Sequence, residues 1–254
     1  MRKITILLAA LLGPALLPVQ AEELHVAVAA NFSAPLQKLA PLFAQASGDQ
    51  LIISAGSSGQ LYTQIKQGAP FDVFLSADID KPRLLEKEGL AVPDSQFTYA
   101  VGALVLWSPK LGVVDRDGKV LQTKKYHLIG VANPQTAPYG TAAQQVLTKL
   151  GLWDKLNQDH RIVTGENITQ TWQYAASGNA DLAFVALSQV LSADGSISGS
   201  SWMVPQSMYE PIDQAGVIIA ASTHKAAAEA FMNWLHHDPA ALAAIRSDGY
   251  RTEH

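Results

Sequence analysis

The chain has 254 residues, with 18 Lys and Arg, 22 Asp and Glu and no cysteine, and its formal net charge is −4 at pH 7. The lack of cysteine excludes disulfides, thiolate nucleophiles and cysteine-bound zinc. An acidic chain without a basic run is a poor candidate for binding nucleic acid or an anionic membrane surface.

The first 21 residues have the pattern of a secretory signal. Residues 1–3 are positively charged, residues 4–17 are apolar, and residues 19–21 resemble a small-x-small cleavage site. A membrane span needs roughly 20 apolar residues, so a cleaved signal is favoured over an anchor. We expect cleavage after Ala21 and a periplasmic mature chain. Loss of Arg2 and Lys3 would take the net charge from −4 to −6.

Short apolar runs then alternate with helical patterns. Runs rich in Val, Ile, Leu and Ala predict strands at residues 25–30, 51–55, 72–76, 103–107, 128–132, 161–164, 181–186 and 217–221. Continuous apolar runs are typical of strands buried on both faces. Five glycines follow helical patterns, as left-handed C-terminal residues do: Gly48, Gly68, Gly89, Gly151 and Gly178. The alternation predicts an α/β fold with largely parallel sheets and right-handed crossovers.

Four segments share one design, in which an apolar strand leads through small or hydroxylated residues into the start of a helix. They are residues 25–36, 51–65, 127–147 and 161–172, and none of the four junctions carries Lys or Arg. The first N–H groups of a helix have no partner in the helix, and the helix dipole is positive there. Four such junctions converging on one cleft would hold a small oxyanion with neutral donors.

The order of the junctions predicts two α/β lobes that face each other across a cleft. The first two junctions lie before residue 100 and the other two after it, so each lobe would contribute two. We expect lobe 1 to comprise residues 22–100 and 216–254, and lobe 2 residues 101–215. A last strand at 216–222 and a helix at 225–236 would return to lobe 1. Ligands of open α/β sheets bind beyond the carboxyl ends of strands.

Several blocks of the mature chain resemble the periplasmic molybdate-binding proteins of ABC importers. They read AVAANFSAPLQKLAPLF, ISAGSSGQLYTQIKQGAPFDVFLSAD, VANPQTAPYGTAAQQVLTKLGLWDKL and FMNWLHHDPAALAAIRSDGY, in that order along nearly the whole mature chain. The resemblance implies a two-lobe periplasmic binding protein fold of type II-like architecture, with crossing strands between the lobes. It also implies a monomer that captures molybdate or tungstate and delivers it to a membrane permease.

The resemblance assigns ligand contacts at the first two junctions. Family members have Ser or Thr-Asn at the first one, which matches Ala30 and Asn31, so Ala30 lacks the Thr hydroxyl. Asn31 would donate through its backbone N–H and its side-chain amide, or would alternatively cap the helix at residues 33–45. At the second junction Ser58 matches the family's serine, with its hydroxyl and N–H as donors. Ser57 is the alternative contact there, and helix capping by either serine stays open.

The resemblance also assigns contacts at the other two junctions. Tyr139 is the middle residue of a Pro-Tyr-Gly segment found in the family, and its N–H is the implied donor; its phenol would cover the cleft or pack on Trp153. At the last junction Glu-Asn-Ile matches the family's Glu-Asp-Val, so the N–H of Ile168 is the implied donor. Some members add a tyrosine hydroxyl where this chain has Ala186, so that donor is absent.

The absence of charge indicates the class of ligand. A fully ionised oxyanion only accepts hydrogen bonds, so a purely donating site suits molybdate, tungstate or sulfate. Monohydrogen phosphate also needs an acceptor, and Glu166 is the one nearby carboxylate. We expect molybdate, and tungstate with it, as ligand, no cofactor and no direct cation ligands. A binding protein for sulfate, another oxyanion or a small organic acid is the alternative.

Enzyme patterns are weak in this chain. The Gly-Ser-Ser-Gly run at residues 56–59 is not the G-x-S-x-G elbow of hydrolases, and a secreted serine hydrolase would need a histidine beside Ser57 or Ser58. The adjacent His236 and His237 would face different directions on a helix, and carboxylates at Asp78 and Asp80 are typical of helix caps. We therefore predict a binding protein and not an enzyme.

Overall fold

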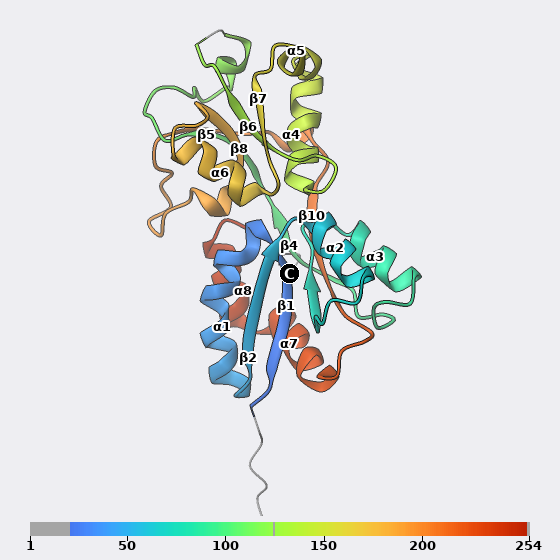
Figure 1. Cartoon of the computed structure of the whole chain (residues 1–254). Helices are drawn as coiled ribbons and strands as arrows, with labels where there is room; N and C mark the ends of the chain where they lie inside the picture. The colour runs from blue at the N-terminus through green and yellow to red at the C-terminus, as the bar shows by residue number, and fades with distance from the viewer. Residues whose placement is uncertain (1–20, 124, 253–254) are drawn as a thin grey trace, which may run out of the picture.

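The computed structural model describes residues 21–123 and 125–252, so residues 1–20 of the expected signal segment lie outside the described residues. Two lobes, each built on its own five-stranded sheet, are stacked end to end and joined where β4 and β10 lie (Figure 1). None of the helices in these two ranges is long and apolar enough to cross a membrane. The expected two-lobe α/β fold is confirmed.

The sheet of the first lobe has the strand order β2-β1-β3-β10-β4. Its strands are β1 (Glu23–Ala29), β2 (Gln50–Gly56), β3 (Val73–Leu75), β4 (Phe97–Gly102) and β10 (Ile212–Ile218). β1 is parallel to β2 and β3, whereas β10 is antiparallel to β3 and β4. Helices α1 (Ser33–Ser47), α7 (Lys225–His237) and α8 (Pro239–Ser247) pack together on one face, and α2 (Ser58–Lys66) and α3 (Asp80–Lys87) cover the other.

The sheet of the second lobe has the order β7-β6-β8-β5-β9. Its strands are β5 (Leu104–Ser108), β6 (Ile129–Ala132), β7 (Ile162–Gly165), β8 (Leu182–Ala186) and β9 (Ser200–Met203). Helices α4 (Pro138–Lys149) and α5 (Trp153–Gln158) lie on one face and α6 (Ile168–Ala176) on the other. Short 3₁₀ turns complete the chain: η1 (Ala30–Phe32), η2 (Lys119–Gln122), η3 (Leu187–Gln189) and η4 (Gln206–Met208).

The strands differ from the sequence expectation at three places. β4 and β9 were not expected, and the last strand of the first sheet spans residues 212–218 and not 216–222. β10 in the first sheet and β5 in the second run antiparallel to both of their neighbours, so both sheets are mixed instead of largely parallel. The expected helix ends are confirmed, because all five predicted glycines have positive φ: Gly48, Gly68, Gly89, Gly151 and Gly178.

The chain passes between the lobes at short connections. β4 ends at Gly102 and β5 begins at Leu104, and the return runs from Tyr209 to the start of β10 at Ile212. The Tyr209 hydroxyl accepts a hydrogen bond from the N–H of Leu104, which ties the two connections together at 3.1 Å. These crossing segments form a compact hinge beside the cleft.

Candidate functional site

The four strand-to-helix junctions meet around one small cavity between the lobes. It is tight, with a volume of about 10 Å³. Its lining comes from all four junctions and from the end of β3: Ala29, Ala30, Asn31, Gly56, Ser57, Ser58, Ala77, Ala137, Pro138, Tyr139, Asn167 and Ile168. The structure therefore brings together all six residues that the sequence singled out.

The first turn of α2 leaves one backbone donor for the cavity. Ser57 is the N-cap and its hydroxyl accepts from the N–H of Gln60 in a capping box, while the N–H of Gly59 donates to the Thr136 carbonyl at 2.9 Å. Ser58 is the first helical residue, so its N–H has no partner in the helix. The Ser58 hydroxyl accepts from the N–H of Ala77 at 2.9 Å, which leaves its own proton to donate.

The first turn of α6 repeats this pattern. The Asn167 side-chain oxygen caps the helix by accepting from the N–H groups of Thr169 and Gln170, each at 3.0 Å. Those N–H groups belong to the second and third helical residues, so the cap leaves the N–H of Ile168, the first one, without a partner in the helix. An apolar side chain suits this position because Ile168 is buried in a hydrophobic core cluster.

The start of α4 supplies a third backbone donor. Pro138 is the first helical residue and has no N–H, and Gly140 donates to the Ala137 carbonyl at 2.8 Å. The N–H of Tyr139 between them has no partner in the helix. The Tyr139 phenol points to the hinge, where a side chain at Gly102 would collide with its hydroxyl. Burial raises the pKa of Tyr139 well above its ordinary value, so the phenol stays neutral.

Asn31 occupies the second position of η1, and its side chain faces the interior of the first lobe. Its amide Nδ2 donates to Gln214 Oε1 at 2.8 Å and to the Tyr250 hydroxyl at 3.0 Å. The N-cap of α1 is Phe32, so Asn31 is not the cap of that helix. The side-chain amide is committed to internal partners, which leaves the backbone of Asn31 as its contribution to the cavity.

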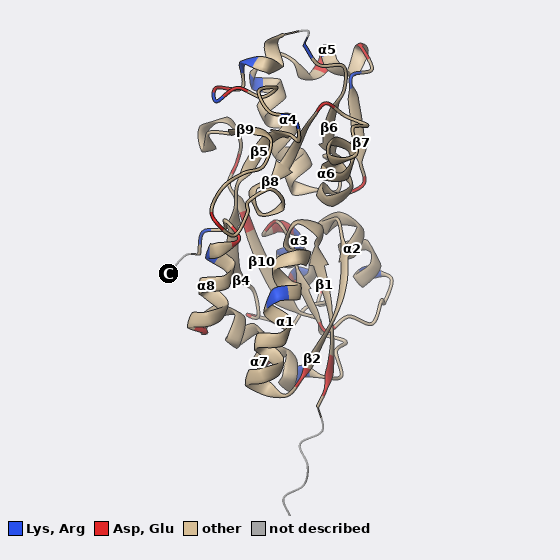
Figure 2. Ribbon diagram, turned by 90° about the vertical axis from the view of Figure 1, so that its left-hand side faces the viewer, with Lys and Arg blue, Asp and Glu red and all other residues tan. Residues whose placement is uncertain are grey.

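The lining of this cavity is uncharged. Asp78, which follows the lining residue Ala77 in the chain, pairs with Lys81 at 2.9 Å. Glu166 is exposed and is not among the lining residues, so it brings no acceptor to the cavity. Figure 2 shows charged residues scattered over both lobes of a mainly uncharged ribbon.

Comparison with known proteins identifies the family. The model of the bacterial extracellular solute-binding protein family matches residues 24–251. The molybdate-binding protein ModA of Rhodobacter capsulatus is 48% identical over 246 residues, which cover 97% of this chain and 94% of that protein. The chain belongs to the bacterial extracellular solute-binding protein family. ModA of Azotobacter vinelandii is also 48% identical over 231 residues, covering 91% of this chain and 90% of that protein.

The solved structures agree with this assignment to the solute-binding family. The Azotobacter vinelandii periplasmic molybdate-binding protein superimposes with a TM-score of 0.89, covering 91% of this chain and 100% of that one. The sulfate-binding protein SubI of Mycobacterium tuberculosis shares the fold at a TM-score of 0.75 and 16% identity. The fold is thus common to binders of different oxyanions, so the ligand has to be argued from the site.

The expectation that the chain is not an enzyme is confirmed by these relatives, which are binding proteins. The side-chain partners of Ser57 and Ser58 are Gln60 and Ala77, and no histidine is among them in the described part of the chain. Asp78 accepts from the N–H of Lys81 at the start of α3, as a capping carboxylate does. Within residues 21–123 and 125–252, no group of His, Asp and Glu could hold a metal ion.

Sequence reasoning did not find the residues that join the lobes around the cavity. Thr169 and Ser188 of the second lobe donate to the backbone carbonyls of Ala30 and Asn31 in the first. A local pattern carries no signal for such contacts, because the partners are 139 and 157 residues apart in the chain.

Proposed function

We propose that this protein is the periplasmic molybdate-binding component of an ABC importer, and that it also binds tungstate. The observation that supports this most directly is the set of helix-start N–H groups of Ser58, Tyr139 and Ile168, which surround one uncharged cavity. The names and 48% identity of the two ModA relatives agree with it. Asn31 and the Ser58 hydroxyl complete the proposed donor set, with Ala30 and Ser57 as flanking residues.

The chemistry of the lining suits a fully ionised tetrahedral dianion. Such a guest needs donors on all sides and offers no proton, and the lining provides donors without a carboxylate acceptor. About five charge-assisted hydrogen bonds contribute roughly 1.5–3 kcal/mol each, less an association cost of several kcal/mol. This balance allows affinities from the micromolar to the nanomolar range without Lys or Arg.

Thermal unfolding with different oxyanions tests the proposed ligand. Molybdate and tungstate at about one hundred times their Kd should stabilise the chain by about 2.7 kcal/mol, a rise in Tm of about 5–10 °C. Sulfate should have a smaller effect and phosphate a negligible one, because phosphate carries a proton that the lining cannot accept. Equal stabilisation by sulfate would refute the specificity, and no shift with any of the four would refute oxyanion binding.

Export and delivery are further parts of the proposal. The mature chain would begin at Glu22, act as a monomer and present the closed lobes to a membrane permease. Mass spectrometry of the periplasmic fraction should find an N-terminus at Glu22, and light scattering should give the mass of one chain. The reconstituted cognate permease should hydrolyse ATP faster when this protein and molybdate are both present; stimulation independent of molybdate would contradict delivery.

A further inference from the structure

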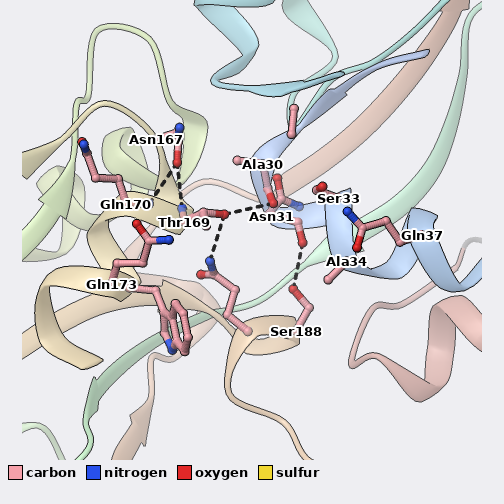
Figure 3. A pocket seen from close by; sticks show the side chains of 13 residues that line it. Ala30, Asn31, Ser33, Ala34, Gln37, Asn167, Thr169, Gln170, Gln173 and Ser188 are labelled. Carbon is pink, nitrogen blue, oxygen red and sulfur yellow. Dashed lines mark hydrogen bonds between the residues drawn. The ribbon is translucent and has the colours of Figure 1, made fainter. Parts of the chain in front are cut away.

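Two hydroxyl groups of the second lobe reach across the cleft to the backbone of the first ligand junction. Thr169 Oγ1 donates to the carbonyl of Ala30 at 3.2 Å, and Ser188 Oγ donates to the carbonyl of Asn31 at 3.1 Å. Figure 3 shows both contacts at the wall of a groove that shares Ala30, Asn31 and Asn167 with the lining of the cavity. Both hydrogen bonds join the two lobes, so they would be lost if the lobes moved apart.

The two carbonyls matter because they carry partial negative charge next to an oxyanion site. A carbonyl oxygen turned toward the cavity would repel a dianion, whereas one held by a donor on its other side leaves the neighbouring N–H to face the guest. The Asn31 carbonyl also accepts from the Tyr250 hydroxyl at 2.8 Å, a contact within the first lobe. Ser188 Oγ lies 2.9 Å from that Tyr250 hydroxyl and 3.1 Å from the carbonyl, so its single proton is shared between the two oxygens and holds this group of Asn31 and Tyr250 from the second lobe.

The short turn η3 carries one of these hydroxyls and contacts the other. Ser188 and Gln189 lie in η3, directly after β8. Gln189 Oε1 accepts from the N–H of Ala186 at 3.0 Å, while its Nε2 lies 3.3 Å from the Ile168 carbonyl and 3.5 Å from Thr169 Oγ1. η3 thus connects Ser188 with the start of α6, where Ile168 offers its N–H to the cavity.

We propose that Ser188 and Thr169 are positioning residues that make oxyanion affinity depend on closure of the lobes. They act through the carbonyls of Ala30 and Asn31 and need not touch the ligand. This inference rests on the proposed function, because it describes how the same site is assembled. Contacts that form only after closure slow the release of ligand and leave the encounter with the open form unchanged.

Stopped-flow kinetics with molybdate tests the proposal, with Trp172 in the groove as an intrinsic fluorescence reporter. Ser188→Ala and Thr169→Val should each release molybdate about 3- to 10-fold faster, as expected for one lost hydrogen bond, with association rates within about twofold of the parent. We expect the unliganded Tm to be unchanged, because the proposal places both contacts in the closed form alone.

Two control variants separate positioning from general damage. Ser188→Thr keeps the hydroxyl and should release molybdate at nearly the parent rate. Ser177→Ala removes an exposed hydroxyl that donates to the Gln173 carbonyl within the second lobe, and it should change neither rate. A parent-like release rate in Ser188→Thr supports the proposal, because it shows that the hydroxyl at this position slows release.

Clear outcomes would overturn the proposal. Parent-like release by both Ser188→Ala and Thr169→Val would refute it and leave the proposed function standing. Slower association with unchanged release would also refute it, because the hydroxyls would then shape the open form. A parent chain that fails to bind molybdate would refute the proposed function and this inference with it.

Discussion

Neighbouring serines at the start of α2 have separate tasks. The hydroxyl of Ser57 accepts from the N–H of Gln60 and so completes the capping box of the helix. The hydroxyl of Ser58 accepts from the N–H of Ala77 and keeps its proton for the cavity. Both residues are buried, at 3% and 1% exposure, so water does not replace these hydrogen bonds. Ser57 therefore caps the helix, and Ser58 is the serine that we propose as a ligand donor.

Alanine variants of these serines should separate affinity from stability. Ser58→Ala should weaken molybdate binding about 10- to 100-fold, because it removes one charge-assisted donor. Ser57→Ala, the matched control, should lower the free energy of unfolding by about 1 kcal/mol through loss of the cap and leave affinity near the parent value. Calorimetry and urea unfolding without ligand measure the two effects. A larger loss of affinity in Ser57→Ala would reverse the assignment.

Asp72 links the start of β3 to the segment before α7. It accepts from the N–H of His25 at 2.8 Å and from the Ser222 hydroxyl at 2.6 Å, and it lies 3.1 Å from the Nδ1 of His224. Burial raises the pKa of Asp72, but the hydrogen bonds from Ser222, His25 and His224 outweigh burial and lower it below 3.8. The charged carboxylate is therefore the form that stabilises the fold.

The lowered pKa predicts an acid-dependent stability. The contribution of Asp72 should be complete above about pH 4, the value for the unfolded chain, and should be lost as the pH falls through the folded pKa. Asp72→Asn should unfold at lower urea concentration than the parent at pH 7, and the difference should shrink toward pH 2.5. Asp80→Asn changes an exposed carboxylate and should show no such trend. A constant difference across this range would contradict the prediction.

At the scale of elements, the starts of three helices provide the backbone donors of the proposed site. In the first turns of α2, α4 and α6, most N–H groups donate to a capping side chain or to a carbonyl, and Pro138 has no N–H. One N–H group in each turn is left without such a partner. These groups belong to Ser58, Tyr139 and Ile168. Each helix therefore contributes a single aimed donor instead of a diffuse positive end. Binding should depend on these N–H groups more than on the side chains that accompany them.

Replacing Ile168 with proline removes one such N–H. Proline is well accepted as the first residue of a helix, and Asn167 before it is extended, with φ −147° and ψ 175°, as a residue before proline prefers. Ile168→Pro should therefore fold and bind molybdate about 10- to 100-fold more weakly. Ile168→Val keeps the N–H and should retain affinity. Circular dichroism verifies the fold, and equal affinities in the two variants would exclude this N–H as a donor.

Features that depend on neighbouring residues were predictable from the sequence, and features that depend on distant ones were not. Strand ends, helix starts and glycine C-caps follow from local patterns, which explains why the four junctions could be identified. The last strand was placed too late because Gln214 interrupts its apolar run. That side chain is fully buried, and its Oε1 accepts from Asn31 and from the Tyr99 hydroxyl, contacts made by residues far apart in the chain.

At the scale of the whole molecule, a side chain of the second lobe lies at the crossing segments that join the lobes. The phenol of Tyr139 lies against Gly102, the last residue of β4, and its hydroxyl makes no hydrogen bond among the described residues. A side chain at Gly102 would also lie 2.9 Å from the Nε2 of Gln214. Gly102 therefore leaves the room that the closed arrangement needs.

An alanine at Gly102 should oppose closure. Gly102→Ala should weaken molybdate binding about tenfold or more, because overpacking costs typically 1–3 kcal/mol, and X-ray scattering should show a larger radius of gyration at equal molybdate concentration. Tyr139→Phe alone should bind within about twofold of the parent, since the hydroxyl has no partner to lose. Combined with Gly102→Ala it should recover part of the lost affinity. Parent-like binding by Gly102→Ala would rule out this steric role.

One hydrogen bond between the lobes allows the rate of their separation to be measured by hydrogen exchange. The amide of Gly59 is bonded to the Thr136 carbonyl on the opposite side of the cleft, so its proton can exchange with deuterium only when the two halves part. Its exchange rate therefore counts spontaneous openings, with no label or substitution added to the chain. Comparing that rate in the empty and loaded protein would measure how firmly the guest holds the two halves together.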